Sequence, residues 1–146
     1  MGSSEHVRYL EPTQASGHAL IQRAIPGPIV MLNLLRFRSV ADYSRSPHLV
    51  PGEPISGAAA YDRYVAHTLP YLIRSGGELL FSGNGGEFLI GPEHERWDRV
   101  LLVRQSGIDS FMTFATDAAY LAGLGHRTAA LEDSRLLPLI ELPRCS

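Results

Sequence analysis

The stretch IVMLNLLRF, from Ile29 to Phe37, decides the fold. Alternate residues of a strand point to opposite faces, and here both faces are apolar, so the stretch is predicted to be a strand buried on both sides. Asn33 and Arg36 interrupt the apolar run. A buried amide or guanidinium without partners costs roughly 1–3 kcal/mol, so both side chains are expected to be hydrogen-bonded or paired. We expect this strand to be the central one of its sheet, with any functional site near it.

The composition is that of one globular domain. The chain has 146 residues, of which 45% are hydrophobic and 19% charged, and this balance argues against disorder. A net charge of −2 without a basic run gives no electrostatic footprint for nucleic-acid binding. No apolar stretch approaches the ~20 residues of a membrane span, and residues 1–12 lack the apolar core of a signal peptide. The single cysteine, Cys145, allows no disulfide within the chain, which favours a cytoplasmic location.

Two irregular segments flank the central strand. Residues 1–28 are predicted to form an N-terminal extension with a short helix that begins after Thr13, its N-cap, and ends before the breaking sequence IPGP. Residues 38–56 are polar and rich in proline, which predicts a long loop. Two interpretations of this loop stay open: it covers a functional site, or it is a tolerated insertion.

The remaining chain alternates between helical and strand patterns. Residues 57–75 carry an apolar stripe at helical spacing, with Ser56 as N-cap, and Pro70 is predicted to kink the helix or split it. A strand is predicted at 78–82, ended by the turn GNGG and resumed at 87–90, and a second strand at 97–105. A helix is predicted at 108–122, with a Ser106–Asp109 capping box at its start and a restart at Asp117. A polar connection at 126–135 and an edge strand at 136–142, which contains Pro138, complete the chain.

The predicted order after the extension is β-α-β-β-α-β, which is the ferredoxin-like plan. The fold class is therefore α+β, with residues 29–142 forming a four-stranded antiparallel sheet that has helices on one face. The other face of the sheet would expose apolar side chains of the central strand, and large exposed apolar patches signal a partner. A second copy of the chain, related by a two-fold axis, would cover this face. We therefore expect a homodimer that forms a dimeric α/β barrel.

Four blocks of sequence carry a resemblance to a known family. They are MLNLLRFR at 31–38, ISGAAAYDRY at 55–64, WDRVLLVR at 97–104 and HRTAALEDSRLLP at 126–138. Together they resemble an uncharacterised family of small dimeric α/β-barrel proteins, known only as a domain of unknown function. The resemblance runs from Tyr9 to Pro138 and implies a ferredoxin-like dimer, but no reaction. More distant proteins of this fold include cofactor-free monooxygenases, tautomerising enzymes and haem-handling proteins, a likeness of fold alone.

Six residues are candidates for a site. Asn33 and Arg36 lie on opposite faces of a regular strand, so they share a pocket only if a bulge lies between them. The Asn33 amide could hold a ligand carbonyl, or it bonds backbone; Arg36 could bind a ligand, or it pairs with a carboxylate. His126 is the candidate catalytic residue, because histidine titrates near neutral pH, and the neighbouring Arg127 could bind a substrate carboxylate. The alternative is that Arg127 and Arg135 form a salt-bridge network with Glu132 and Asp133 at the dimer edge.

Trp97 and Asp98, at the start of a predicted strand, are the other candidate ligand contacts. The alternatives are that Trp97 packs in the core or at an interface, and that Asp98 caps a neighbouring backbone amide or pairs with an arginine. No histidine pair has metal-ligand spacing, and no motif implies a cofactor, so we expect neither. Two functions remain: a cofactor-free enzyme or binding protein for a small polar organic ligand, with His126 as proton carrier and Asn33 as carbonyl holder, or a non-catalytic homodimeric module.

Overall fold

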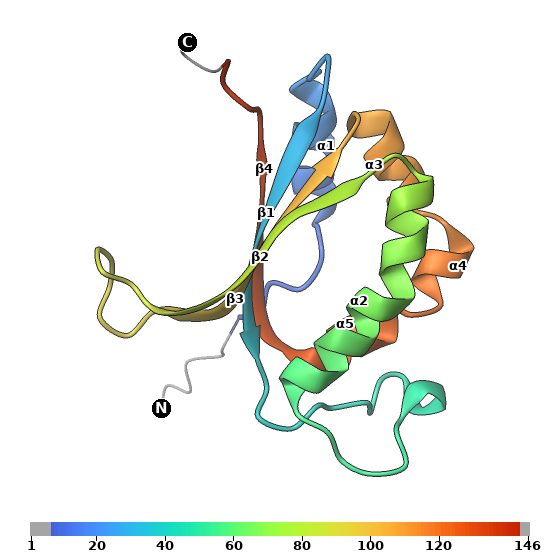
Figure 1. Ribbon diagram of the computed structural model, residues 1–146, viewed down its shortest axis with the longest axis vertical. Coiled ribbons are helices and arrows are strands. Elements are labelled where there is room, and N and C mark those ends of the chain that lie inside the picture. Colours follow the sequence, from blue (N-terminus) through green and yellow to red (C-terminus); the bar gives the residue numbers. More distant parts are fainter. Residues whose placement is uncertain (1–6, 144–146) are drawn as a thin grey trace.

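The computed structural model describes residues 7–143, so the calls on residues 1–6 and on Cys145 lie outside the described part. Four strands form one twisted sheet, and the helices lie on one side of it (Figure 1). In chain order the elements are α1 (Gln14–Gln22), β1 (Ile29–Phe37), the 3-10 turn η1 (Pro47–Leu49), α2 (Gly57–Arg74), β2 (Glu78–Glu87), β3 (Arg96–Gln105), α3 (Ile108–Ala115), α4 (Ala118–Leu121), α5 (Leu124–Ala130) and β4 (Leu131–Leu139).

The strand order is β2-β3-β1-β4, and all three neighbouring pairs are antiparallel. This is the ferredoxin-like arrangement, and the prediction that the Ile29–Phe37 strand lies at the centre is confirmed. Each of the two central strands is therefore bonded on both edges, whereas β2 and β4 form the edges of the sheet.

The two faces of β1 differ in what covers them. Leu35 is fully buried against Tyr61 and Tyr64 of α2, and Met31 is buried with residues of α1 and α3. On the other face, Leu32 and Leu34 are only half-buried in the single chain. The face that carries them is the open face of the sheet, which no helix covers (Figure 1).

The N-terminal predictions hold closely. Thr13 is the N-cap of α1, and its hydroxyl oxygen accepts from the Ser16 amide at 3.0 Å. Ser56 caps α2, and Gly76, with a φ of 90°, ends the helix by allowing Gly77 N to donate to Leu72 O. Pro70 lacks a backbone N–H and so removes one hydrogen bond from α2, but it does not split the helix. The buried stripe from Tyr61 to Leu72 keeps the helix packed on the sheet on both sides of Pro70.

The C-terminal third departs from the predictions. Residues 126–135 are not a polar connection: His126 and Arg127 belong to helix α5, and β4 already begins at Leu131 rather than at Leu136. Ala129, Ala130 and Leu131 are buried in the core, so small apolar residues drive this junction although charged residues follow at once. Pro138 does lie in an edge strand, as predicted.

Two smaller expectations also fail. The GNGG sequence is not a turn, because β2 runs on to Glu87 and Gly85 lies directly against the Trp97 carbonyl, where no Cβ would fit. The capping box at Ser106 does not form either: α3 begins after Gly107, and the Ser106 hydroxyl pairs with Ser110 at 2.7 Å. The restart at Asp117 is confirmed, since its carboxylate caps α4 by accepting from the Ala119 amide.

The loop at 38–56 is held by backbone hydrogen bonds along its length. Arg38 N donates to Ala130 O at 2.9 Å, and Asp42 N donates to Ala129 O at 2.9 Å, so the loop is fixed to the end of α5. Ala41 N donates to Ile55 O at 2.9 Å and closes the loop on itself. The long loop is thus an ordered layer over α5.

We predict that Gly57→Ala destabilises the fold by roughly 2–3 kcal/mol, because an added Cβ would lie 2.6 Å from the Ala130 carbonyl oxygen and still closer to the Arg38 carbonyl oxygen. Urea denaturation measures the change. Gly52→Ala is the matched control, since nothing lies within 4 Å of a Cβ there. Equal stability of the two variants would contradict the tight backbone approach.

Candidate functional site

His126 lies on α5 and is joined to the loop by a hydrogen bond between its Nδ1 atom and the Tyr43 hydroxyl, at 2.8 Å. The two rings meet edge to face with centroids 5.6 Å apart. Tyr43 is buried, and His126 is half-buried. Among residues 7–143, no hydrogen-bond partner faces the other ring nitrogen, Nε2.

Burial and positive neighbours keep the His126 ring neutral. Its pKa is lowered from the ordinary 6.5, first by burial and then by Arg63 and His67 of α2 and by His48 of η1. Burial raises the pKa of the Tyr43 hydroxyl, against the opposing effect of Arg63. At neutral pH the pair therefore consists of an uncharged imidazole and a protonated phenol, which can exchange donor and acceptor roles.

Two glycines set the position of α5. At Gly125 a Cβ would meet the Ser46 hydroxyl and Leu49, and at Gly123 it would meet the imidazole ring of His67. The loop and α2 therefore approach the backbone of α5 more closely than any side chain would allow. This packing brings the loop residue Tyr43 within hydrogen-bond distance of His126.

A shallow hollow of about 270 Å³ opens on the outer side of Tyr43. Its walls come from the loop alone and are mostly apolar, with Glu53 as the one acidic residue. His126 does not line it, so Tyr43 is the link between the hollow and the imidazole. The residues that line it are Val40, Ala41, Tyr43 and the run 50–55.

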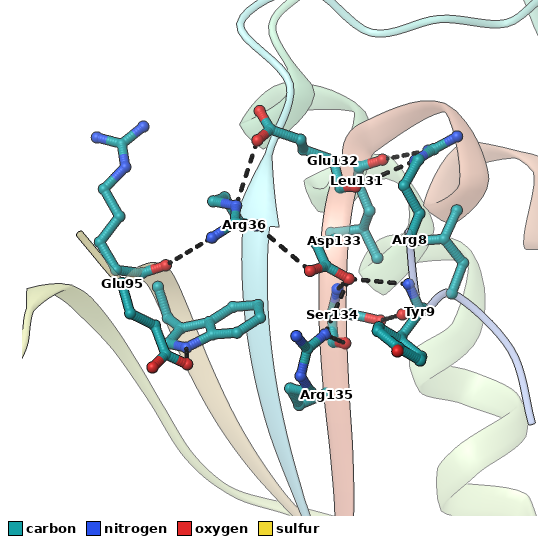
Figure 2. Close-up of polar contacts among 12 residues, drawn as sticks. Arg8, Tyr9, Arg36, Glu95, Leu131, Glu132, Asp133, Ser134 and Arg135 are labelled. Atoms are coloured by element: carbon teal, nitrogen blue, oxygen red, sulfur yellow. Dashed lines mark hydrogen bonds and ion pairs between the residues drawn. The ribbon is translucent and has the colours of Figure 1, made fainter. Parts of the chain in front are cut away.

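Arg36, Trp97 and Asp98 come together elsewhere, around the end of β1. Figure 2 shows Arg36 directed toward Glu132 and Asp133. The Arg36 guanidinium lies 5.1 Å from the centre of the Trp97 ring, and its terminal nitrogen contacts the Asp133 carboxylate at 3.3 Å. Arg36 therefore pairs with a carboxylate, as one of the two interpretations expected, and that carboxylate is Asp133. A second carboxylate, that of Glu132, lies 3.3 Å from Arg36 Nε. Asp98 accepts from the Phe37 amide at 2.8 Å, which is the backbone cap considered for it.

Asp133 is the centre of this second group, and its ion pair with Arg135 belongs to the salt-bridge network considered from the sequence. Its side chain is 4% exposed and accepts from the amides of Tyr9 and Ser134 and from Arg135. Burial would raise the pKa of Asp133, but these hydrogen bonds and the Arg135 charge hold it below its ordinary value. The Arg135 guanidinium also lies 5.0 Å from the Trp97 ring, so two arginines share one buried indole.

Asn33 and Arg127 join neither group. The Asn33 amide donates to Met31 O at 3.2 Å, which is a local backbone contact of the kind weighed against ligand binding. Arg127 bonds to the Leu10 carbonyl and, at 3.3 Å, to the Ser134 hydroxyl, so it holds the N-terminal segment against β4. No contact connects Asn33 with His126 in the described part of the chain.

The six predicted residues therefore divide between two centres and two structural positions. Tyr43 and Tyr9 were missed, because each gains its role from a partner 83 or more residues away in the chain. The acidic and basic residues at 132–135 were a visible signal, but their pattern was interpreted as a connection rather than a strand.

Residues 7–143 contain no group of three or more His, Cys, Asp or Glu side chains arranged to hold a metal ion. No helix within this range has the length and apolar character needed to cross a bilayer.

Two crystal structures of RPA0582, a protein of unknown function from Rhodopseudomonas palustris, the second in methylated form, match this fold, each with a TM-score of 0.79. The sequences are 34% and 35% identical, over 94% and 93% of this chain and 100% and 96% of RPA0582. This chain belongs to the RPA0582 family. The resemblance to an uncharacterised family is confirmed, and membership brings no known reaction with it.

An uncharacterized NIPSNAP domain protein from Burkholderia xenovorans matches with a TM-score of 0.50 and 12% identity, over 81% of this chain and 98% of its own. An identity this low shows the fold alone. No protein-family model and no curated protein matches the chain.

We predict that Asp133→Asn lowers stability by roughly 2–3 kcal/mol, because it leaves the partly buried Arg36 and Arg135 without their shared charge. The carboxylate stabilises the fold above its ordinary pKa of 3.8, and that contribution is lost as the pH falls from there through the lower pKa of the folded state. Urea denaturation across this pH range should therefore show less acid sensitivity in the variant.

Glu132→Gln is the matched control, since the Glu132 side chain is 45% exposed and contacts only Arg36 among these groups. A loss of stability in Glu132→Gln as large as in Asp133→Asn would show that Asp133 is not the centre of the cluster.

Proposed function

We propose that the protein is a homodimeric, cofactor-free enzyme that moves a proton on a small polar organic compound, with Tyr43 and His126 as its reacting pair. The observation that carries this proposal is the 2.8 Å contact between the Tyr43 hydroxyl and His126 Nδ1 beside the hollow in the loop. A neutral histidine paired with a protonated tyrosine is a competent base and acid at neutral pH.

The proton would follow the hydrogen bond. A ligand in the hollow gives the proton of an acidic C–H or O–H to the Tyr43 oxygen, while the Tyr43 hydroxyl proton passes to His126 Nδ1. The imidazolium that forms is disfavoured by burial and by Arg63, His67 and His48, so it readily gives a proton back. Tyr43 lines the mostly apolar hollow, so it is the residue of the pair that a ligand there would contact.

The homodimer is inferred from the open face of the sheet. One row of apolar side chains crosses all four strands in register, where Leu32 of β1 pairs with Leu102 of β3 and with Leu137 of β4, and Leu102 pairs with Phe81 of β2. Phe81 and Leu137 are each 53% exposed in the single chain. A row of this kind is complementary to itself across a two-fold axis, so a second copy would bury it.

The hairpin between β2 and β3 supports the same arrangement. It bends away from the helices, toward the side of the open face (Figure 1). Near its tip, Leu89 and Ile90 are 99% and 90% exposed. Two apolar side chains exposed to water near the tip of the hairpin favour contact with another copy of the chain, because that contact would bury them.

A second candidate function is a homodimeric module without catalysis. The apolar row and the hairpin favour it as much as they favour the enzyme, because both functions need the dimer. The Tyr43–His126 pair is what distinguishes the two.

We predict that the protein accelerates hydrogen–deuterium exchange at the acidic C–H of at least one small 1,3-dicarbonyl or 2-keto acid in D2O, measured by mass spectrometry. His126→Gln should slow this exchange about 10²–10⁴-fold, the usual contribution of a general base. The rate should fall as the pH drops through the His126 pKa, which lies below 6.5, because only the neutral ring accepts a proton.

His18→Gln is the control, since His18 is exposed on α1 and bonds to no residue of the site. Tyr43→Phe should reduce exchange while leaving the fold intact by circular dichroism. Exchange that is equal in wild type and His126→Gln, or absent with the whole compound panel, would favour the non-catalytic module.

We also predict that the wild-type chain sediments as a dimer and that Leu137→Glu sediments as a folded monomer, because the carboxylate would lie in the centre of the apolar row. Analytical ultracentrifugation measures the change. Ile73→Glu, at an equally exposed position on α2, should remain a dimer. A monomeric wild type would refute the proposed interface.

A further inference from the structure

A second hollow, the strand-end hollow, has a volume of about 270 Å³ and opens at the end of the sheet opposite the β2–β3 hairpin. It lies on the open face, because Val30 and Arg104 line it and stand two residues along their strands from Leu32 and Leu102 of the apolar row. A cavity of about 150 Å³ is enough to hold a benzene ring, so the strand-end hollow has room for an aliphatic side chain. Its apolar walls are formed by Ile25, Pro26, Pro28, Val30 and Ile140.

The charged residue at the base of this hollow, Arg104, is not neutralised by its neighbours. Glu78 of β2 lies opposite Arg104 in the strand register, and Glu141 shares the hollow with it. Among residues 7–143, no ion pair joins Arg104 to either carboxylate. The strand-end hollow therefore combines apolar walls with a guanidinium group that has no carboxylate partner within the described chain.

The tip of the hairpin carries the complementary groups. Leu89 and Ile90 are 99% and 90% exposed. Glu93 follows on the exposed part of the tip, and the carboxylate of Glu95 accepts only from the Trp97 indole, at 3.4 Å, within residues 7–143. Neither glutamate belongs to an ion pair there. Apolar side chains and negative charge at the tip thus match apolar walls and positive charge in the hollow.

A two-fold axis along the apolar row would bring the tip and the hollow together. Pro28, in the wall of the hollow, is four residues from Leu32 of the row. Trp97, at the base of the hairpin, is five residues from Leu102 of the row, in the direction of the other end of the sheet. At about 3.3 Å per strand residue, both lie about 13–17 Å from the row. Rotation about the row exchanges the two ends of the sheet, and the hairpin bends toward the open face (Figure 1), so the hairpin of one copy would reach the hollow of the other.

We propose that the hairpin tip inserts Leu89 and Ile90 into the strand-end hollow of a second copy of the chain, with Glu93 and Glu95 beside the partner's Arg104. The inference rests on the homodimer proposed above and names the contact that completes each hollow. Two such contacts form at once, one from each hairpin, so they hold the dimer at both ends of the sheet. The contact uses no chemistry of Tyr43 or His126.

The test is disulfide cross-linking between two full-length chains, each with one cysteine introduced in a Cys145→Ser background. Leu89→Cys and Ile140→Cys chains carry different affinity tags, are co-expressed and purified through both tags, and are then oxidised. We expect a disulfide-linked pair on a non-reducing gel, because Ile140 lines the hollow and is 52% exposed in the single chain. Leu89→Cys expressed alone should not cross-link, since the two tips lie at opposite ends of the dimer.

The control is Leu89→Cys with Ile73→Cys, because Ile73 is 61% exposed on α2 and should not cross-link to the tip. A wild type that sediments as a dimer, together with no cross-link between Leu89→Cys and Ile140→Cys, would overturn the docking contact and leave the homodimer standing. A monomeric wild type would overturn both. Cross-linking of Leu89→Cys to itself would also overturn the contact, because the tips would then meet each other.

A second measurement addresses the strength of the contact. Leu89→Ser/Ile90→Ser should raise the dissociation constant of the dimer about tenfold or more, measured by analytical ultracentrifugation over a concentration series. Val40→Ser/Ile73→Ser is the matched control, since both side chains are exposed aliphatic groups away from the tip. Arg104→Gln should weaken the dimer and reduce its dependence on salt concentration. Dissociation constants equal to that of the wild type in all three variants would contradict the proposal.

Discussion

The structure depends on a close approach of three backbone segments at Gly57. There the first residue of α2 donates its N–H to Arg38 O at 3.0 Å, while Arg38 N donates to Ala130 O at 2.9 Å. The start of α2, the end of β1 and the end of α5 are thereby joined without any intervening side chain. Since the loop at 38–56 is attached to the same carbonyls, the position of Tyr43 relative to His126 also follows from this contact.

The two polar centres show how one sheet separates two kinds of chemistry. The Tyr43–His126 pair lies among the helices and loop, where burial and positive neighbours keep an imidazole uncharged. The Arg36–Asp133–Arg135 cluster lies at the end of the central strands, where strong paired charges fix the N-terminal segment and the indole of Trp97. The pKa of His126 is lowered, so the first centre holds a neutral imidazole, whereas hydrogen bonds and Arg135 lower the pKa of Asp133, so the second centre holds an ionised carboxylate.

The fold was largely predictable, because its signals are local. The continuous apolar run of β1, the Ser56 cap and the Gly76 stop all act within a few residues, and each forms as expected. The α5–β4 junction was not predictable in this way, since Glu132 and Asp133 are polar in sequence and become strand residues only through partners on β1 and in the N-terminal segment. The same reason hid Tyr43: its role depends on a helix 83 residues later, and nothing in its own neighbourhood marks it.

The edge strand β4 has a consequence for how the protein associates. An exposed strand edge offers unpaired carbonyls and amides on which another chain can build a fibre. Here Arg8 occupies the carbonyls of Leu131 and Glu132, and Pro138 has no amide proton to offer. Both features hinder growth of the sheet beyond β4, whereas the proposed homodimer uses the broad face of the sheet. Contact through a face closes after two copies, whereas contact through an edge continues without limit, so the arrangement favours a finite particle over an aggregate.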